Sequence, residues 1–322
     1  MIRTPLCDLL GIETPIIQAG MGPFGSGAEL AAAVSNAGAL GTLGAAGRPP
    51  EDLAEQLGRI RDLTDRPFAV NLVFHQPFEE PFAAILEARP AVFSFALGDP
   101  GDMVDRAHDA SIRFLQQVHT VPQARRMADR GVDAIIAQGT EAGGFGGGIA
   151  SLPLVPQVVD AVDPIPVVAA GGIADGRGLA AALVLGAQGA NVGTRFLACE
   201  EASISDDWKQ AILDADSSQT IRAEMWWDVF PMPPGEFDVV PRTLRTAFLD
   251  AWHDDPDAAK READRMRAEF VSAVQRGTTE EKAPFTGQSA GLIEDVLPAA
   301  EIVRRFVQQS QEALTRASAT LS

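Results

Sequence analysis

The stretch Pro166-Val-Val-Ala-Ala-Gly-Gly-Ile-Ala-Asp175 decides the fold, together with the later stretch Gly189-Ala-Asn-Val-Gly-Thr-Arg-Phe196. Each contains a short apolar run that ends in glycine, and residues 177–186 between them have the composition of a helix. Two parallel strands that each open into a glycine turn leave backbone N–H groups unpaired at one edge, where they can hold a phosphate. In an eight-stranded α/β barrel, a common phosphate site follows strands seven and eight.

Six further apolar runs precede this pair, and helical segments separate them. The expected strands cover residues 15–19, 40–43, 67–73, 91–95, 112–118 and 134–138, and the expected helices cover residues 28–37, 50–64, 79–89, 100–110, 121–130 and 154–161. The two decisive stretches thus become strands seven and eight. This alternation predicts a (β/α)8 TIM barrel. A doubly wound open sheet is the main alternative, but the tally of eight and the glycine turns favour the barrel.

The strand–helix alternation stops near Ser203, which indicates a second part of the chain. We expect a barrel over residues 1–204 and a smaller, mostly helical lid or substrate domain over residues 205–285. Residues 286–322 form a C-terminal segment, whose amphipathic helix is expected to return to the barrel wall.

Composition excludes several classes of partner. Of the 322 residues, 44 are acidic and 26 are Lys or Arg, so the net charge is −18, which disfavours nucleic acid and anionic membranes. No apolar run approaches the length of a membrane span. Cys7 and Cys199 have neither metal-site nor disulfide spacing, and we expect both to be buried and no metal to be bound. We expect a cytoplasmic protein, and a homo-oligomer is compatible with the sequence.

The ordered glycine motifs resemble the nitronate monooxygenase family, also called 2-nitropropane dioxygenases. The matching pieces are Pro15-Ile-Ile-Gln-Ala-Gly-Met21, Pro67-Phe-Ala-Val-Asn-Leu72, Gln138-Gly-Thr-Glu-Ala-Gly-Gly144, Val168-Ala-Ala-Gly-Gly-Ile173, Gly189-Ala-Asn-Val-Gly-Thr-Arg-Phe196 and Gly287-Gln-Ser-Ala-Gly-Leu292. The resemblance implies an FMN-dependent TIM barrel with a helical second domain. Flavin-type enoyl reductases of fatty-acid synthesis and some NAD(P)H:quinone reductases share much of this pattern, so it supports fold and FMN better than the reaction.

Carried over by position, the resemblance assigns FMN binding to ten residues: Gly20, Met21, Asn71, Gln138, Gly143, Gly172, Asn191, Val192, Gly193 and Thr194. Asn71 and Gln138 end strands, so their amides are expected at the carboxyl-terminal face, where an amide can donate to or accept from a flavin edge. Simple capping of the strand ends is the alternative for both. Gly172, Gly193 and Thr194 would offer N–H groups and a hydroxyl to the phosphate.

One position departs from the family pattern. The loop after strand six usually reads Glu-Ala-Gly-Gly-His, with the histidine as general base, whereas this chain has Glu141-Ala-Gly-Gly-Phe145. Oxidising a neutral nitroalkane requires removal of an α-proton, and a positioned base contributes about 10²–10⁴-fold to such a step. A nitronate has already lost that proton. We therefore expect activity on nitronates and little on neutral nitroalkanes; a Phe145 wall that selects a different substrate is the alternative.

Other side chains have weaker claims to the site. His75, just beyond strand three, is the best substitute base, although a surface position is the more common one for such a residue. His119 follows strand five on the same face. Glu141 is expected to hold its own loop through backbone N–H groups, and Trp226 and Trp227 to pack within the second domain rather than to form a lid over the flavin.

Three functions remain open. The first is an FMN-dependent oxidoreductase of the nitronate monooxygenase type, in which a small-molecule substrate reduces the flavin and O₂ reoxidises it. The second is an NAD(P)H-dependent flavin reductase that acts on a quinone or an enoyl thioester. The third is a flavin- or phosphate-binding protein without turnover, which the missing histidine favours.

Overall fold

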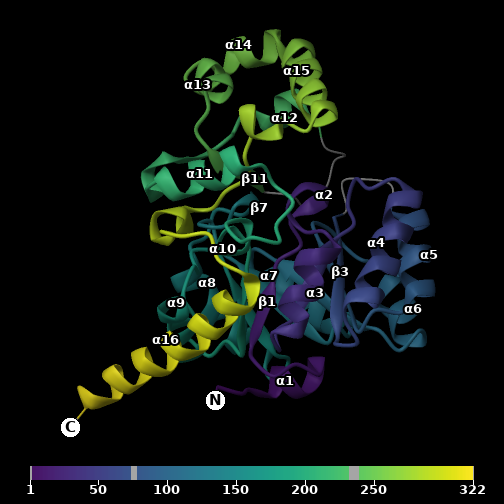
Figure 1. Ribbon diagram of the computed structural model, residues 1–322, viewed down its shortest axis with the longest axis vertical. Helices are drawn as coiled ribbons and strands as arrows, with labels where there is room; N and C mark the ends of the chain where they lie inside the picture. The colour runs from purple at the N-terminus through teal and green to yellow at the C-terminus, as the bar shows by residue number, and fades with distance from the viewer. Residues whose placement is uncertain (1, 74–77, 232–238, 322) are drawn as a thin grey trace.

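The computed structural model describes residues 2–73, 78–231 and 239–321 (Figure 1). Its largest sheet has eight parallel strands in the order β1-β9-β8-β6-β5-β4-β3-β2. They are β1 (Ile16–Gln18), β2 (Gly41–Gly44), β3 (Phe68–Val73), β4 (Val92–Ala96), β5 (Arg113–Val118), β6 (Ala134–Gln138), β8 (Val167–Ala170) and β9 (Gly189–Val192). A parallel bridge between Ile17 and Leu40 closes the sheet beside β2. The predicted barrel is therefore confirmed, and the open sheet is wrong.

Helices surround this barrel (Figure 1). They are α1 (Pro5–Leu10), α3 (Ala28–Asn36), α4 (Pro50–Leu63), α5 (Glu79–Ala88), α6 (Met103–Asp109), α7 (Val121–Asp129), α8 (Ser151–Val162), α9 (Gly176–Val184) and α16 (Ala299–Ala319), with the short turns α2 (Gly22–Gly25) and α10 (Thr194–Leu197) next to the strand ends. The long α16 packs against α9 and α3 (Figure 1). Within the described ranges, no helix combines the length and the apolar character needed to cross a membrane.

Alternating side chains along the strands build two apolar layers. Strand residues such as Ile17, Val92 and Val168 point into the barrel, where they pack with Leu6 and Leu10 of α1. The residues between them point outward and pack against the surrounding helices in the larger core. This follows from the strand period of two, and it leaves the carboxyl-terminal end of the barrel for polar side chains.

The helices between residues 206 and 276 lie above the carboxyl ends of the barrel strands and are called here the second unit (Figure 1). Its helices are α11 (Asp206–Asp214), α12 (Trp226–Val229), α13 (Ala247–His253), α14 (Pro256–Arg261) and α15 (Ala263–Arg276). The sequence did not predict its antiparallel sheet of order β10-β11-β7, with β10 (Thr220–Arg222), β11 (Val240–Leu244) and β7 (Gly144–Gly146). Because β7 lies in the glycine loop after β6, this sheet joins the barrel to the second unit.

Candidate functional site

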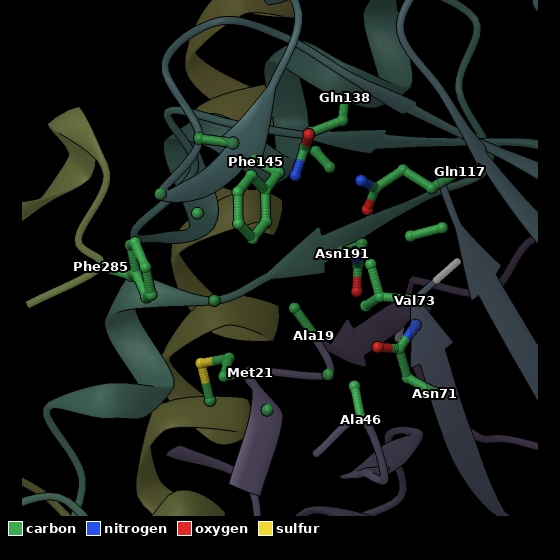
Figure 2. A pocket seen from close by; sticks show the side chains of 18 of the residues that line it. Ala19, Met21, Ala46, Asn71, Val73, Gln117, Gln138, Phe145, Asn191 and Phe285 are labelled. Atoms are coloured by element: carbon green, nitrogen blue, oxygen red, sulfur yellow. The ribbon is translucent and has the colours of Figure 1, made fainter. Parts of the chain in front are cut away.

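A cavity of about 680 Å³ lies between the carboxyl ends of the barrel strands and the second unit. Its floor consists of residues in the barrel interior, at the ends of the barrel strands and in the loops that follow (Figure 2). Its other wall is apolar and is called here the aromatic roof: Phe145, Trp226, Trp227, Phe230, Phe270 and Phe285. A site at this face is the usual arrangement for a barrel of this type.

Nine of the ten predicted cofactor-binding residues line this cavity: Gly20, Met21, Asn71, Gln138, Gly143, Gly172, Asn191, Gly193 and Thr194. The tenth, Val192, does not, because it alternates with Asn191 along β9 and packs in the core between barrel and helices. Phe145 also lines the cavity, whereas His75 lies outside the described residues.

Asn71 lies on β3, and its amide is directed toward the cavity (Figure 2). Its Nδ2 donates to the Ser94 carbonyl at 3.2 Å, which leaves Oδ1 as an acceptor. Gly20 makes this position possible, since a Cβ there would lie 2.4 Å from the Asn71 Cβ. The amide therefore contacts the neighbouring strand, as the capping alternative holds, and also lines the cavity.

Gln138 ends β6, and a buried histidine behind it sets the direction of its amide. His119 Nε2 lies 2.9 Å from Gln138 Oε1, and in the tautomer that carries the proton on Nε2 this nitrogen donates, which leaves the Gln138 Nε2 group to face the cavity (Figure 2). Burial lowers the pKa of His119 to about 4, against smaller raising effects of its hydrogen bonds with Gln138 and the Phe145 backbone. His119 is thus neutral at neutral pH and supports Gln138 rather than lining the cavity.

Phe145 is held on β7, opposite Pro241 of β11. Its ring stacks on Trp227, with a centroid distance of 5.4 Å and an interplanar angle of 20°. The Phe285 ring lies 5.9 Å away on another side. Position 145, where the sequence resemblance led us to expect a base in the family, is therefore part of an apolar surface.

Gly172 and Gly193 are glycines for different structural reasons. Gly172 has a φ of +74°, which side chains other than glycine rarely adopt. At Gly193 the backbone would tolerate a Cβ, because the nearest atom would be Ala19 Cβ at 3.7 Å; the glycine leaves space on the cavity side. Thr194 Oγ1 accepts a hydrogen bond from the Gly287 N–H at 2.9 Å and keeps its own O–H as a donor.

Glu141 holds the start of α8, as its predicted structural role requires. Both carboxylate oxygens lie 3.0 Å from the Ser151 N–H, and the Ser151 hydroxyl donates to Oε2 at 2.9 Å. Arg222 fixes the other end of the loop through the Gly147 carbonyl at 2.7 Å. These contacts place Glu141 in the support of the loop rather than in proton transfer.

Several lining residues were not predicted from the sequence. Gln117 lies next to the last residue of β5, and its side chain faces the cavity (Figure 2). The argument that placed the Gln138 amide at the end of a strand would have found it. Ser94 on β4 is a similar case. Trp226 and Trp227 belong to the apolar core of the second unit and also line the cavity. Phe270 and Phe285 come from segments far along the chain from the barrel strands, and no local sequence pattern predicts that they line the cavity.

The part of the chain that the structure describes contains no group of three or more His, Cys, Asp or Glu side chains arranged to hold a metal ion. Both cysteines are buried and unpaired by disulfide. Burial, together with the nearby Glu201, raises the pKa of the Cys199 thiol to about 12, so that sulfur stays protonated.

A family model described as nitronate monooxygenase matches residues 3–89 and 76–309. A Mycobacterium tuberculosis protein named (3aS,4S,5R,7aS)-5-hydroxy-7a-methyl-1-oxo-octahydro-1H-indene-4-carboxyl-CoA dehydrogenase is 40% identical over 223 residues, 68% of this chain and 62% of that protein. The match therefore spans less than two thirds of that relative. A nitronate monooxygenase from Paraburkholderia phytofirmans is 32% identical over 362 residues, 97% of this chain and 96% of that protein.

Solved structures are similar over nearly the whole chain. FabK from Thermotoga maritima has a TM-score of 0.90 and 32% identity, with 99% of this chain and 100% of that chain covered. A nitroalkane oxidase from Streptomyces ansochromogenes has a TM-score of 0.82 and 30% identity, with 97% of this chain and 99% of that chain covered.

Proposed function

We propose that this chain, which belongs to the nitronate monooxygenase family, binds FMN and oxidises alkyl nitronates with O₂. The observation that carries the proposal is a single cavity that combines a floor of amides and glycine turns with an apolar wall at Phe145. Proteins of this family are flavoproteins, and the choice of FMN, nitronate and O₂ is ours.

The lining residues fit FMN. A volume of about 680 Å³ is within the range of small-molecule and cofactor sites. The open space at Gly193, the Gly172 turn and the Thr194 hydroxyl would receive the phosphate, since glycine permits close backbone approach. The amides of Asn71 and Gln138 would meet the ring edges. When bound, FMN would supply the electron acceptor that no side chain can provide.

The charge distribution of the cavity favours a substrate that arrives deprotonated. Among the described lining residues the one charged side chain is Arg267, and none is His, Asp, Glu or Lys. Phe145 cannot accept a proton, so the chain binds and orients a nitronate and shields it from water rather than generating it. We retain His75 as a proposed substitute base for any activity on neutral nitroalkanes.

Residues 205–285 would act as the lid of this site, with residues 1–204 as the FMN-binding barrel and residues 286–322 as the closing segment. Two contacts support this division. The Arg222 guanidinium of the second unit binds the loop after β6, and the Gly287 N–H reaches Thr194 beside β9. A small-molecule substrate and O₂ would be the reaction partners, and the oligomeric state is a matter for measurement.

The test is to record the visible spectrum of the purified protein and to add ethylnitronate and NADH to separate anaerobic samples. We expect a flavin spectrum that ethylnitronate bleaches and NADH does not, with FMN released on denaturation. A colourless protein that cannot be reconstituted with FMN would contradict the cofactor assignment.

The second candidate, an NAD(P)H-dependent flavin reductase that acts on a quinone or an enoyl thioester, draws support from the similarity to a carboxyl-CoA dehydrogenase. Bleaching by NADH alone would assign the chain to that class. Bound FMN that neither donor reduces would instead support a flavin-binding protein without turnover.

A further inference from the structure

The aromatic roof is larger than a small alkyl substrate needs. Trp226 is its centre, with the Phe230 ring at 4.7 Å, the Phe270 ring at 5.1 Å and the Phe285 ring at 5.5 Å between centroids. The Phe145–Trp227 stack extends the same surface. A methyl or ethyl group could cover little of it and would leave ring faces in contact with water.

Contacts with the backbone hold the roof in place. The Trp227 indole Nε1–H donates to the Val239 carbonyl at 2.6 Å, and the Arg267 Nε–H donates to the Val229 carbonyl at 2.8 Å, at the end of α12. Phe145 is fixed by the pairing of β7 with β11. Because these polar groups already have hydrogen-bond partners, the rings present mainly apolar surface to the cavity before any ligand binds.

The electrostatics of the lining agree with an anion that has a large apolar body. The described lining contains no carboxylate, and its one charged side chain is Arg267, whose side chain is 40% exposed beside Asp264. A ring under the roof would gain offset or edge contacts with several aromatic side chains. Its negative charge would meet no like charge among these residues.

We propose that the substrate carries an aromatic or other large planar apolar group, seated under the aromatic roof, so that aryl-substituted nitronates bind more tightly than small alkyl nitronates. This inference rests on the proposed function. It assigns Phe145 and Trp227 the role of specificity-determining residues, in the place where a base would otherwise act.

Binding is measured without turnover by titrating the holoenzyme with carboxylates shaped like the nitronates, following quenching of tryptophan fluorescence. Phenylacetate stands for the nitronate of phenylnitromethane, and propionate stands for ethylnitronate. We expect phenylacetate to bind at least about tenfold more tightly than propionate. Equal dissociation constants for the two acids would overturn the proposal.

Substitutions at Phe145 test whether the aromatic roof causes the preference for phenylacetate over propionate. Phe145→Ala and Phe145→Leu are expected to lower the ratio of dissociation constants toward one, with Val271→Ala as the control, because Val271 lies on α15 with 43% exposure and away from the cavity lining. Thermal unfolding checks that each variant is folded. If Phe145→Ala does not fold, Phe145→Leu, which keeps an apolar side chain, carries the test. An unchanged ratio in folded Phe145 variants would overturn the assignment to the roof.

The proposed function fails separately from this inference. Normal flavin bleaching with equal KM for ethylnitronate and the nitronate of phenylnitromethane would leave the function standing and overturn the aryl preference. Absence of bleaching by both nitronates would contradict the function, while the carboxylate titrations would still decide whether the roof selects a planar apolar group.

Discussion

Phe145 is the residue on which the proposed chemistry depends most. It occupies the loop position where the sequence resemblance implies a histidine in the family, and its ring lies beside those of Trp227 and Phe285. A lone replacement of a base by phenylalanine in a polar pocket would indicate lost activity. Here the neighbours are apolar as well, which favours a changed substrate and a reaction that begins from an anion.

The buried His119 is expected to make the free energy of unfolding depend on pH. Its pKa is about 4 in the folded chain because of burial, whereas an exposed histidine has a pKa of about 6.5. Between these values the unfolded chain binds more protons, so the free energy of unfolding falls as pH is lowered from about 6.5 to about 4, by up to about 3 kcal/mol.

Urea unfolding at pH 7 and pH 4.5 checks this expectation, with His119→Gln as the matched variant. The Gln side chain keeps an amide N–H for Gln138 but does not titrate, so the variant should lose this part of the pH dependence. The same decrease in wild type and variant would show that other groups cause it.

At the level of elements, β7 joins the carboxyl-terminal face of the barrel to the second unit by pairing with β11. The glycines before it allow the loop to pass close to the C-terminal segment. A Cβ on Gly143 would lie 2.7 Å from the Gly287 nitrogen and 2.8 Å from the Thr286 carbonyl carbon, and both are backbone atoms that cannot move independently.

Gly143→Ala is therefore expected to destabilise the protein by about 1–3 kcal/mol, as overpacking does. Gly148→Ala is the matched control in the same loop, because no atom lies within 4 Å of the Cβ built there. Chemical denaturation measures both variants. Equal stability of the two would mean that the loop can move away from the C-terminal segment.

The elements also show where sequence reasoning reaches its limit. The eight barrel strands were predictable because each is an apolar run between helices, and residues 15–19 and 134–138 each contain one observed strand. The strands β7 and β10 have three residues each and pair with a segment distant in the chain. Such short strands carry no period of their own, since their pairing depends on tertiary contacts.

The site was predictable to a similar extent. Strand-end amides and glycine turns follow from local pattern, so Asn71 and Gln138 were found, and Gln117 would have been by the same argument. Val192 was predicted with its neighbours to bind the cofactor, and its side chain packs in the core instead of lining the cavity, because a motif does not show which face each side chain takes. Cofactor binding through its backbone stays a prediction. The roof positions Phe270 and Phe285 required the three-dimensional arrangement of the second unit.

In the whole molecule the second unit lies above the barrel (Figure 1). Strand-end amides of the barrel and aromatic side chains of the second unit line the same cavity between them. The barrel supplies the groups suited to a flavin, and the second unit supplies the surface suited to a substrate. The net charge of −18 therefore says little about the cavity, because its described lining has no acidic side chain.

We propose that this chain oxidises nitronates without a base at position 145. Anaerobic stopped-flow mixing of the holoenzyme with ethylnitronate and with nitroethane tests it most directly. We predict that ethylnitronate reduces the flavin about 10²–10⁴-fold faster at neutral pH, and that Phe145→His narrows this difference by accelerating nitroethane. Equal rates with the two substrates in the wild-type protein would contradict the claim.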